Sequence, residues 1–211
     1  MDAYTTEQEQ IEKIKKWWDE NGKAIVFGLI LGVGGLFGYR YWESARLAEG
    51  QSASINYEHL LAIASAGAGD EATQAGETII NAYPKSTYAR LASLVLAKLA
   101  VDIRNLEEAK SRLQWVIDHS EGGKLKPVAL ARMAQIHIAE GNTEQAAAMV
   151  AAIDAEHADQ FLEIRADVLL AQGEPEQARA LYSLALVEAR KRGSGGEAIQ
   201  LKIDNLALAA R

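Results

Sequence analysis

The hydrophobic pattern divides the chain into one uninterrupted apolar run near its start and a long region of helical periodicity after it. Residues 24–39 read AIVFGLILGVGGLFGY and contain no charged side chain, whereas Lys23 precedes the run and Arg40 follows it. Trp18 and Trp42 lie just outside these charges. Amphipathic aromatic rings and basic residues at both borders of an apolar run are typical of a helix that spans a bilayer. The pattern therefore predicts a single membrane-spanning helix.

The length of the run sets the bounds of this helix. At about 1.5 Å per residue, the run covers only about 24 Å of a ~30 Å hydrocarbon core, so basic side chains must extend toward the headgroups. We predict a short N-terminal segment over residues 1–23 and the span over residues 24–42. A buried core helix is one alternative, because runs this short are common in soluble proteins. A cleaved signal peptide is another, but 23 residues precede the run and Arg-Tyr-Trp follows it.

The basic residues near the span predict its orientation. The lysines that precede the span are Lys13, Lys15, Lys16 and Lys23. In the twenty residues after the apolar run, the basic residues are Arg40 and Arg46. Lys and Arg are enriched on the cytoplasmic side, so we expect a cytoplasmic N-terminus and a large domain across the membrane, over residues 43–211. The chain has no cysteine, which excludes a lipid-modified N-terminal cysteine, a disulfide framework and a thiolate metal site.

An internal repeat predicts the architecture of residues 43–211. The segment at 134–146 recurs at 166–178 with an offset of 32 residues, and a looser copy at 97–109 precedes it by 37 residues. Each copy has a small residue in one helix and an alanine in the next, and the two closer copies have a glycine at the turn, which resembles the 34-residue tetratricopeptide unit. We therefore predict an all-α fold, in which the membrane helix is followed by a tetratricopeptide-like solenoid of helical hairpins.

The turns of these hairpins carry more specific expectations. We expect Gly141 and Gly173 to end their helices in the left-handed conformation, whereas Arg104 replaces this glycine in the first copy. Side-chain caps should start the second helices, through Asn105 with Glu108 and Asn142 with Gln145.

Other segments flank the repeats. We expect one long helix over residues 41–66, a partner helix over 73–82, an insertion in the loop at 122–124, and a break at 193–196 before a final helix. The repeat lacks the usual tryptophan and closing proline, so an Ala- and Leu-rich helical bundle remains an alternative.

The chemistry-bearing residues do not form a catalytic pattern. The four histidines are isolated in the sequence, no nucleophile or phosphate-loop motif occurs, and carboxylates are scattered at helical spacings. The net charge of −7 disfavours nucleic acid as a partner. We expect no enzyme, no cofactor and no metal site, although an enzyme with an unrecognised site is a remaining alternative.

Two features are candidates for binding other proteins. In the span, Gly28, Gly32 and Gly35 would let another helix approach closely, although glycine is also simply common in membrane helices. The second feature is the concave face that the first helices of tetratricopeptide pairs line, apolar at one end and acidic at the other. Its predicted residues are Leu91, Leu94, Lys98, Val101, Val128, Gln135, Ile138, Gln160, Glu163, Asp167 and Leu170. Such a groove suits an extended or helical segment of a partner, and burial in the core is the alternative for Leu91 and Leu94.

The N-terminal block carries a family resemblance. Residues 10–23, QIEKIKKWWDENGK, together with Gly28-x-x-Leu31-Gly32-x-x-Gly35-x-x-Gly38-x-x-x-Trp42, closely resemble the YfgM family, and the resemblance continues through the repeats to Leu206. It implies a single-pass inner-membrane protein of Gram-negative bacteria that serves as an ancillary subunit of the SecYEG translocon. The implied partners of its periplasmic domain are SecYEG, the chaperone PpiD, other periplasmic chaperones and translocating polypeptides. The resemblance brings no catalytic residues.

The residue patterns predict a membrane-anchored protein that binds other proteins, and the resemblance implies that it passes secreted proteins to periplasmic chaperones. An envelope scaffold that organises a cell-wall or division complex is the alternative from another functional class.

Overall fold

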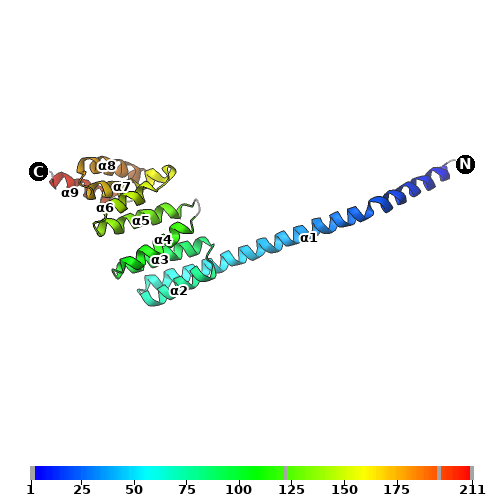
Figure 1. The fold of residues 1–211 in the computed structure, drawn as a ribbon, viewed down its shortest axis with the longest axis horizontal. Coiled ribbons are helices and arrows are strands. Elements are labelled where there is room, and N and C mark those ends of the chain that lie inside the picture. The colour runs from blue at the N-terminus through cyan, green and yellow to red at the C-terminus, as the bar shows by residue number, and fades with distance from the viewer. Residues whose placement is uncertain (1–2, 121–122, 194–195, 210–211) are drawn as a thin grey trace. The chain divides into compact units, whose positions relative to one another are not determined.

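A computed structural model describes residues 3–120, 123–193 and 196–209 of the chain (Figure 1). These residues form helices, with no strand among them. The helices are α1 (Ala3–Ser65), α2 (Gly69–Ala82), α3 (Thr87–Asp102), α4 (Leu106–Asp118), α5 (Leu125–Ala139), α6 (Thr143–Ala151), the 3-10 helix η1 (Ala155–Phe161), α7 (Leu162–Ala171), α8 (Pro175–Arg192) and α9 (Gly196–Ala209). The chain divides into two units, residues 1–52 and residues 53–211, and α1 contributes to both. The all-α prediction is confirmed.

The first unit consists of the N-terminal part of α1. From Ile25 onward α1 contains a stretch long and apolar enough to cross a bilayer, with a mean hydropathy of 1.4 and none of it buried. Near the end of the apolar run, the rings of Tyr39 and Trp42 lie 6.2 Å apart, and the Arg46 guanidinium lies 5.5 Å from the Trp42 ring centre. An aromatic cluster with a basic residue is the composition expected at a membrane border.

The second unit is a stack of helical hairpins. Helices α3 and α4, α5 and α6, and α7 and α8 pack as pairs, while α2 packs on α3, α4 on α5, and α9 on α8 (Figure 1). Each pair therefore contacts mainly its neighbours in the sequence, as in repeat proteins.

Small residues allow the paired helices to approach closely. The alanines that define the repeat are all buried, and they lie in the first helices at 97, 134 and 166 and in the second helices at 109, 146 and 178. The core is divided into four clusters, centred on Leu60 and Ile79, on Leu113 and Val116, on Leu130 and Ile164, and on Tyr182 and Ile199. Trp115 packs against both the first and the second of these clusters.

The hairpin turns share one conformation. Gly141 and Gly173 have φ angles of 77° and 83°, as predicted, and Arg104 adopts the same left-handed conformation with φ of 60°. In all three turns, the residue after the left-handed position donates its backbone N–H to the carbonyl five residues earlier, at 2.8–2.9 Å. The three donors are Asn105, Asn142 and Glu174. This is the Schellman motif, which satisfies the last carbonyls of a helix.

The long helix expected over residues 41–66 is confirmed as the last part of α1, which ends at Ser65 and also includes the predicted span. Two other local expectations were wrong. Helix α2 begins at Gly69 rather than at residue 73. The side chain of Asn105 accepts from the Glu108 N–H at 3.2 Å, but the side-chain oxygen of Asn142 makes no such cap, and its amide nitrogen donates to Glu140 at 3.2 Å. The predicted insertion at 122–124 and break at 193–196 lie partly outside the described residues.

Candidate protein-binding groove

A pocket of about 360 Å³, here called the α3–α5 pocket, lies where the sequence predicts the apolar part of the groove. Three of the predicted residues line it: Lys98 and Val101 on α3, and Gln135 on α5. Lys98 and Val101 lie three residues apart, so both face the same side of α3. Val101 is 41% exposed although it is apolar, so its surface is available to a partner.

Helix α4 forms a part of the pocket that the sequence analysis missed. Leu106 and Leu113 lie seven residues apart on one face of α4 and contribute to the lining, and α5 adds Arg132, Ile136 and Ala139. The guanidinium of Arg132 donates to the Leu94 carbonyl at 3.2 Å, which ties α5 to α3 beside the pocket. The seven-residue spacing of Leu106 and Leu113 could have indicated that α4 contributes to the pocket. The groove prediction missed it because it considered only the first helix of each pair.

Two predicted residues lie farther into the core than the groove register implies. Leu94 is only 5% exposed and belongs to the core cluster of Leu113 and Val116, so it does not present a binding surface. Leu91 is half-buried and packs against the same cluster. The placement of Leu94 favours the alternative of burial in the core over a place on the groove surface, because Leu94 belongs to a cluster with residues of α4 and α5.

The remaining predicted residues are spread along the repeats. Val128 and Ile138 are half-buried against core clusters, and Leu170 is 39% exposed near the end of α7. Gln160 is exposed but lies in the 3-10 helix η1, before α7 begins. The helical register that placed Gln160 beside Glu163 therefore does not hold, because the two residues belong to different elements.

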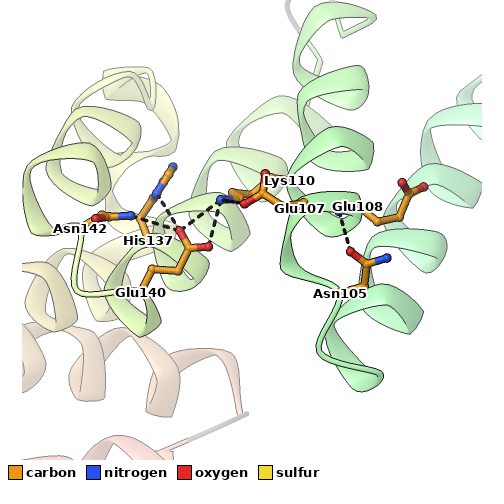
Figure 2. A network of polar contacts seen from close by, with 7 residues as sticks. All are labelled: Asn105, Glu107, Glu108, Lys110, His137, Glu140 and Asn142. Carbon is orange, nitrogen blue, oxygen red and sulfur yellow. Dashed lines mark hydrogen bonds and ion pairs between the residues drawn. The ribbon is translucent and has the colours of Figure 1, made fainter.

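A polar network lies next to the α3–α5 pocket and joins α4 to the end of α5 (Figure 2). The ammonium of Lys110 lies 2.7 Å from Glu107 and 2.9 Å from Glu140, and His137 Nδ1 lies 3.6 Å from Glu140. Hydrogen bonding to Lys110 lowers the pKa of the Glu140 carboxyl, and hydrogen bonds to Glu107 and Glu140 raise the pKa of Lys110. Since Leu106 and Ala139 line the pocket and immediately precede Glu107 and Glu140, this network holds two pocket walls together.

The acidic end of the predicted groove is already occupied by a cation of this chain. Lys202 on α9 forms ion pairs with Glu163 at 2.8 Å and with Asp167 at 2.7 Å, and the Tyr182 hydroxyl donates to Asp167. Burial lowers the pKa of Lys202, but its hydrogen bonds to Asp167 and Glu163 outweigh this effect and raise it overall. The expectation of a free acidic wall is therefore corrected, because these carboxylates hold the C-terminal helix.

The spacing of Lys202 could have revealed this contact. Lys202 follows Asp167 by 35 residues, close to the repeat period, which makes α9 the first helix of an additional repeat unit.

The glycines predicted for helix packing lie in the apolar part of α1. A Cβ atom at Gly28, Gly32 or Gly35 would meet nothing within 4 Å. Within the described ranges, no three His, Asp or Glu side chains are grouped so as to hold a metal ion.

Comparisons with known proteins agree with this geometry. A family described as a tetratricopeptide repeat-like domain matches residues 15–208. The protein named "Ancillary SecYEG translocon subunit" of Escherichia coli K12 is 34% identical over 99% of this chain and its own full length. Proteins of the same name from Haemophilus influenzae and Neisseria gonorrhoeae are 30% and 26% identical over 97% and 98% of this chain and over their own full lengths.

Among solved structures, a Podospora anserina putative kinesin light chain with nearly identical TPR-like repeats has a TM-score of 0.56. The match covers 74% of this chain and 85% of the kinesin light chain structure, at 14% sequence identity. At this identity the match shows a shared fold alone. The chain therefore belongs to the YfgM family of ancillary SecYEG translocon subunits, with a tetratricopeptide repeat-like body.

Proposed function

We propose that this protein is a non-enzymatic adapter, anchored in the inner membrane beside the SecYEG translocon, that passes secreted proteins to periplasmic chaperones. The observation that carries the proposal is full-length similarity to proteins named as ancillary translocon subunits. The apolar segment of α1 supports the anchor, and the α3–α5 pocket offers an exposed apolar surface for a partner segment.

The proposed orientation has residues 43–211 in the periplasm. Four lysines before the span against two arginines after it support this orientation. The proposed partners on that side are PpiD, other periplasmic chaperones and the translocating chains themselves. The proposed contact surfaces are the glycine face of the span and the α3–α5 pocket.

Site-specific photocrosslinking in native membranes tests this proposal. A crosslinking residue at Gln135, which lines the α3–α5 pocket and is exposed, should capture chaperones or secreted chains. The crosslinking amino acid in place of Leu29 in the span should capture SecY. The crosslinking amino acid in place of Ser183, which is exposed on α8, is the control. Capture of cell-wall synthases instead of translocon components would favour an envelope scaffold. Protease added to spheroplasts should digest the large domain; protection until the membrane is dissolved would reverse the orientation.

A further inference from the structure

A second pocket, here called the basic pocket, lies where the chain enters α3, leaves α4 and enters α5. Its volume is about 710 Å³. Lys85, Arg90 and Lys124 line it, and Asp118 is the one carboxylate among the lining residues that the structure describes. Asp118 accepts a hydrogen bond from Gln114 at 2.8 Å. A chain with a net charge of −7 thus concentrates positive charge in one concavity.

The positive charges of the basic pocket are not neutralised by the ion pairs of the described residues. Those pairs engage other cations, such as Lys98, Lys110 and Lys202, and none of them includes Lys85, Arg90 or Lys124. Arg90 donates to the carbonyls of Lys85 and His119 and to the Thr87 hydroxyl, all of which are neutral acceptors. These bonds position the guanidinium between α3 and α4 and leave its charge available to an anion.

The backbone adds to this positive potential. Lys124 is the residue before the first turn of α5, and its side chain makes no capping hydrogen bond there. The first N–H groups of a helix carry partial positive charge; in α5, Lys126 donates its N–H to the Gly123 carbonyl at 3.3 Å and Pro127 has no N–H, so the contribution comes from the helix dipole and not from a row of free donors. In contrast, the start of α3 is capped by Ser86, whose hydroxyl accepts from the Ala89 N–H at 3.0 Å. Ser120 also lines the pocket, and its buried hydroxyl has no hydrogen-bond partner among the described residues.

The apolar part of the lining favours a peptide over a simple anion. Leu91 and Leu125 line the same pocket as the cations, and both are half-buried. Leu91 precedes Lys98 by seven residues on α3, and Leu125 precedes Val128 by three on α5, so both continue the stripes of the predicted groove. The three cations come from separate segments of the chain, so they could bind carboxylates that are spaced along a peptide. The leucines of the same lining could contact apolar side chains of that peptide.

We propose that the basic pocket binds an acidic, partly apolar peptide segment of a partner protein, with its carboxylates on Lys85, Arg90 and Lys124 and an apolar side chain on Leu91 and Leu125. This names the chemistry of a partner for the adapter function proposed above and rests on it. The acidic end of the predicted groove is a weaker candidate for a partner, because Lys202 already pairs there with Glu163 and Asp167.

The test uses the full chain in phosphatidylcholine nanodiscs and a fluorescent synthetic peptide of alternating Glu and Leu. A matched peptide carries Gln in place of each Glu. At low salt, we expect the acidic peptide to bind at least about five-fold more tightly than the Gln peptide, and high salt should remove the difference. Lys85→Glu with Lys124→Glu should weaken binding of the acidic peptide by about ten-fold. Lys85→Gln with Lys124→Gln should weaken it less and guards against misfolding.

The control removes the same charges elsewhere. Arg179→Glu with Lys191→Glu changes two exposed cations of α8, and binding should stay within about two-fold of the parent protein. Equal binding of the Glu and Gln peptides, or undiminished binding by both pocket variants, overturns the proposal. So does binding of phosphatidylglycerol vesicles through Lys85 and Lys124 without peptide binding, which would make the pocket a lipid site. If the acidic peptide does not bind more tightly but crosslinking to the translocon is intact, the basic-pocket proposal fails and the adapter function is still supported.

Discussion

The ammonium group of Lys202 lies 2.7 Å from a carboxylate oxygen of Asp167, across a sequence distance of 35 residues. The same ammonium lies 2.8 Å from Glu163 and 5.5 Å from the centre of the Tyr182 ring. Helix α9 thus contributes the counter-ion for two carboxylates of α7. This contact fixes the last helix of the array onto the preceding repeat, and its loss should be measurable as a loss of stability.

Replacing Lys202 with Met should lower the free energy of unfolding of the repeat domain by about 1–2 kcal/mol, because Asp167 and Glu163 would keep their charges without a counter-ion, although the Tyr182 hydroxyl still donates to Asp167. Lys191→Met, which removes an exposed pair with Glu188, should cost less than about 0.5 kcal/mol. Thermal melts of the full chain in detergent, followed by circular dichroism, compare the two. Equal effects would mean that the Lys202 contacts contribute no more than a surface ion pair.

The double variant Glu163→Lys with Asp167→Lys is expected to act mainly on structure. It would place three ammonium groups together and repel α9 from α7. We expect increased amide hydrogen exchange in α9, and unchanged exchange would contradict this expectation.

The pair of Lys110 and Glu140 predicts a pH dependence of stability. Hydrogen bonding lowers the pKa of Glu140 below its usual 4.5, so the stabilisation is present above this value and is lost as the pH falls through the lowered pKa. The pKa of Lys110 is raised above 10.5, so its contribution is present below this value and is lost as the pH rises through the raised pKa.

Urea unfolding of the parent protein and of Glu140→Gln over a pH series tests this dependence. The difference in unfolding free energy should be present near neutral pH and should shrink as the pH falls through the lowered pKa of Glu140. Glu144→Gln, at an exposed site on α6, serves as the control. A difference that persists unchanged in strong acid would exclude the ion pair as its cause.

Arg104 is a site for a stabilising substitution. It is exposed and has a φ of 60°, a conformation that costs an L-residue with a Cβ about 1 kcal/mol. Arg104→Gly should therefore raise the free energy of unfolding by up to about 1 kcal/mol, and Gly141→Ala should lower it by a similar amount. Urea melts measure both changes, and a destabilising effect of Arg104→Gly would show that the arginine side chain has another role.

Val101→Asp should weaken partner binding at the α3–α5 pocket. Losing an apolar anchor of this size should raise the dissociation rate by roughly ten-fold, with a smaller effect on association. Val187→Asp on α8 makes the same change at a site of similar exposure, 48% against 41%, and is the control. Crosslinking yield from Gln135 is the measurement. Equal yields in both variants, with folding confirmed by circular dichroism, would exclude the pocket as the partner site.

The glycines of the span give a separate prediction. Leucine at both Gly28 and Gly32 should leave membrane insertion unchanged but reduce co-purification with membrane partners, because close helix approach is blocked. Leucine at Gly34 and Gly38, on a rotated face, is the control. Undiminished co-purification would mean that these glycines have no packing role.

The sequence predicted the features that depend on local spacing. The buried alanines of each pair and the left-handed glycines at 141 and 173 follow from residue type and position alone. Contacts between repeats were not predictable in this way. The burial of Leu94 with residues of α4 and α5, the pairing of Lys202 with Asp167 and the gathering of Lys85, Arg90 and Lys124 depend on how successive hairpins stack. The expected cap by Asn142 was wrong, and its amide nitrogen donates to Glu140, two residues away.

The division of the core into four clusters has a consequence for motion. No single centre holds the repeat domain together, so opening one end requires breaking only the contacts of one cluster with its neighbour. The cluster of Tyr182 and Ile199 depends on α9, whereas the cluster of Leu113 and Val116 is enclosed by hairpins on both sides. The last repeat is therefore expected to open and re-form while the middle of the array stays folded.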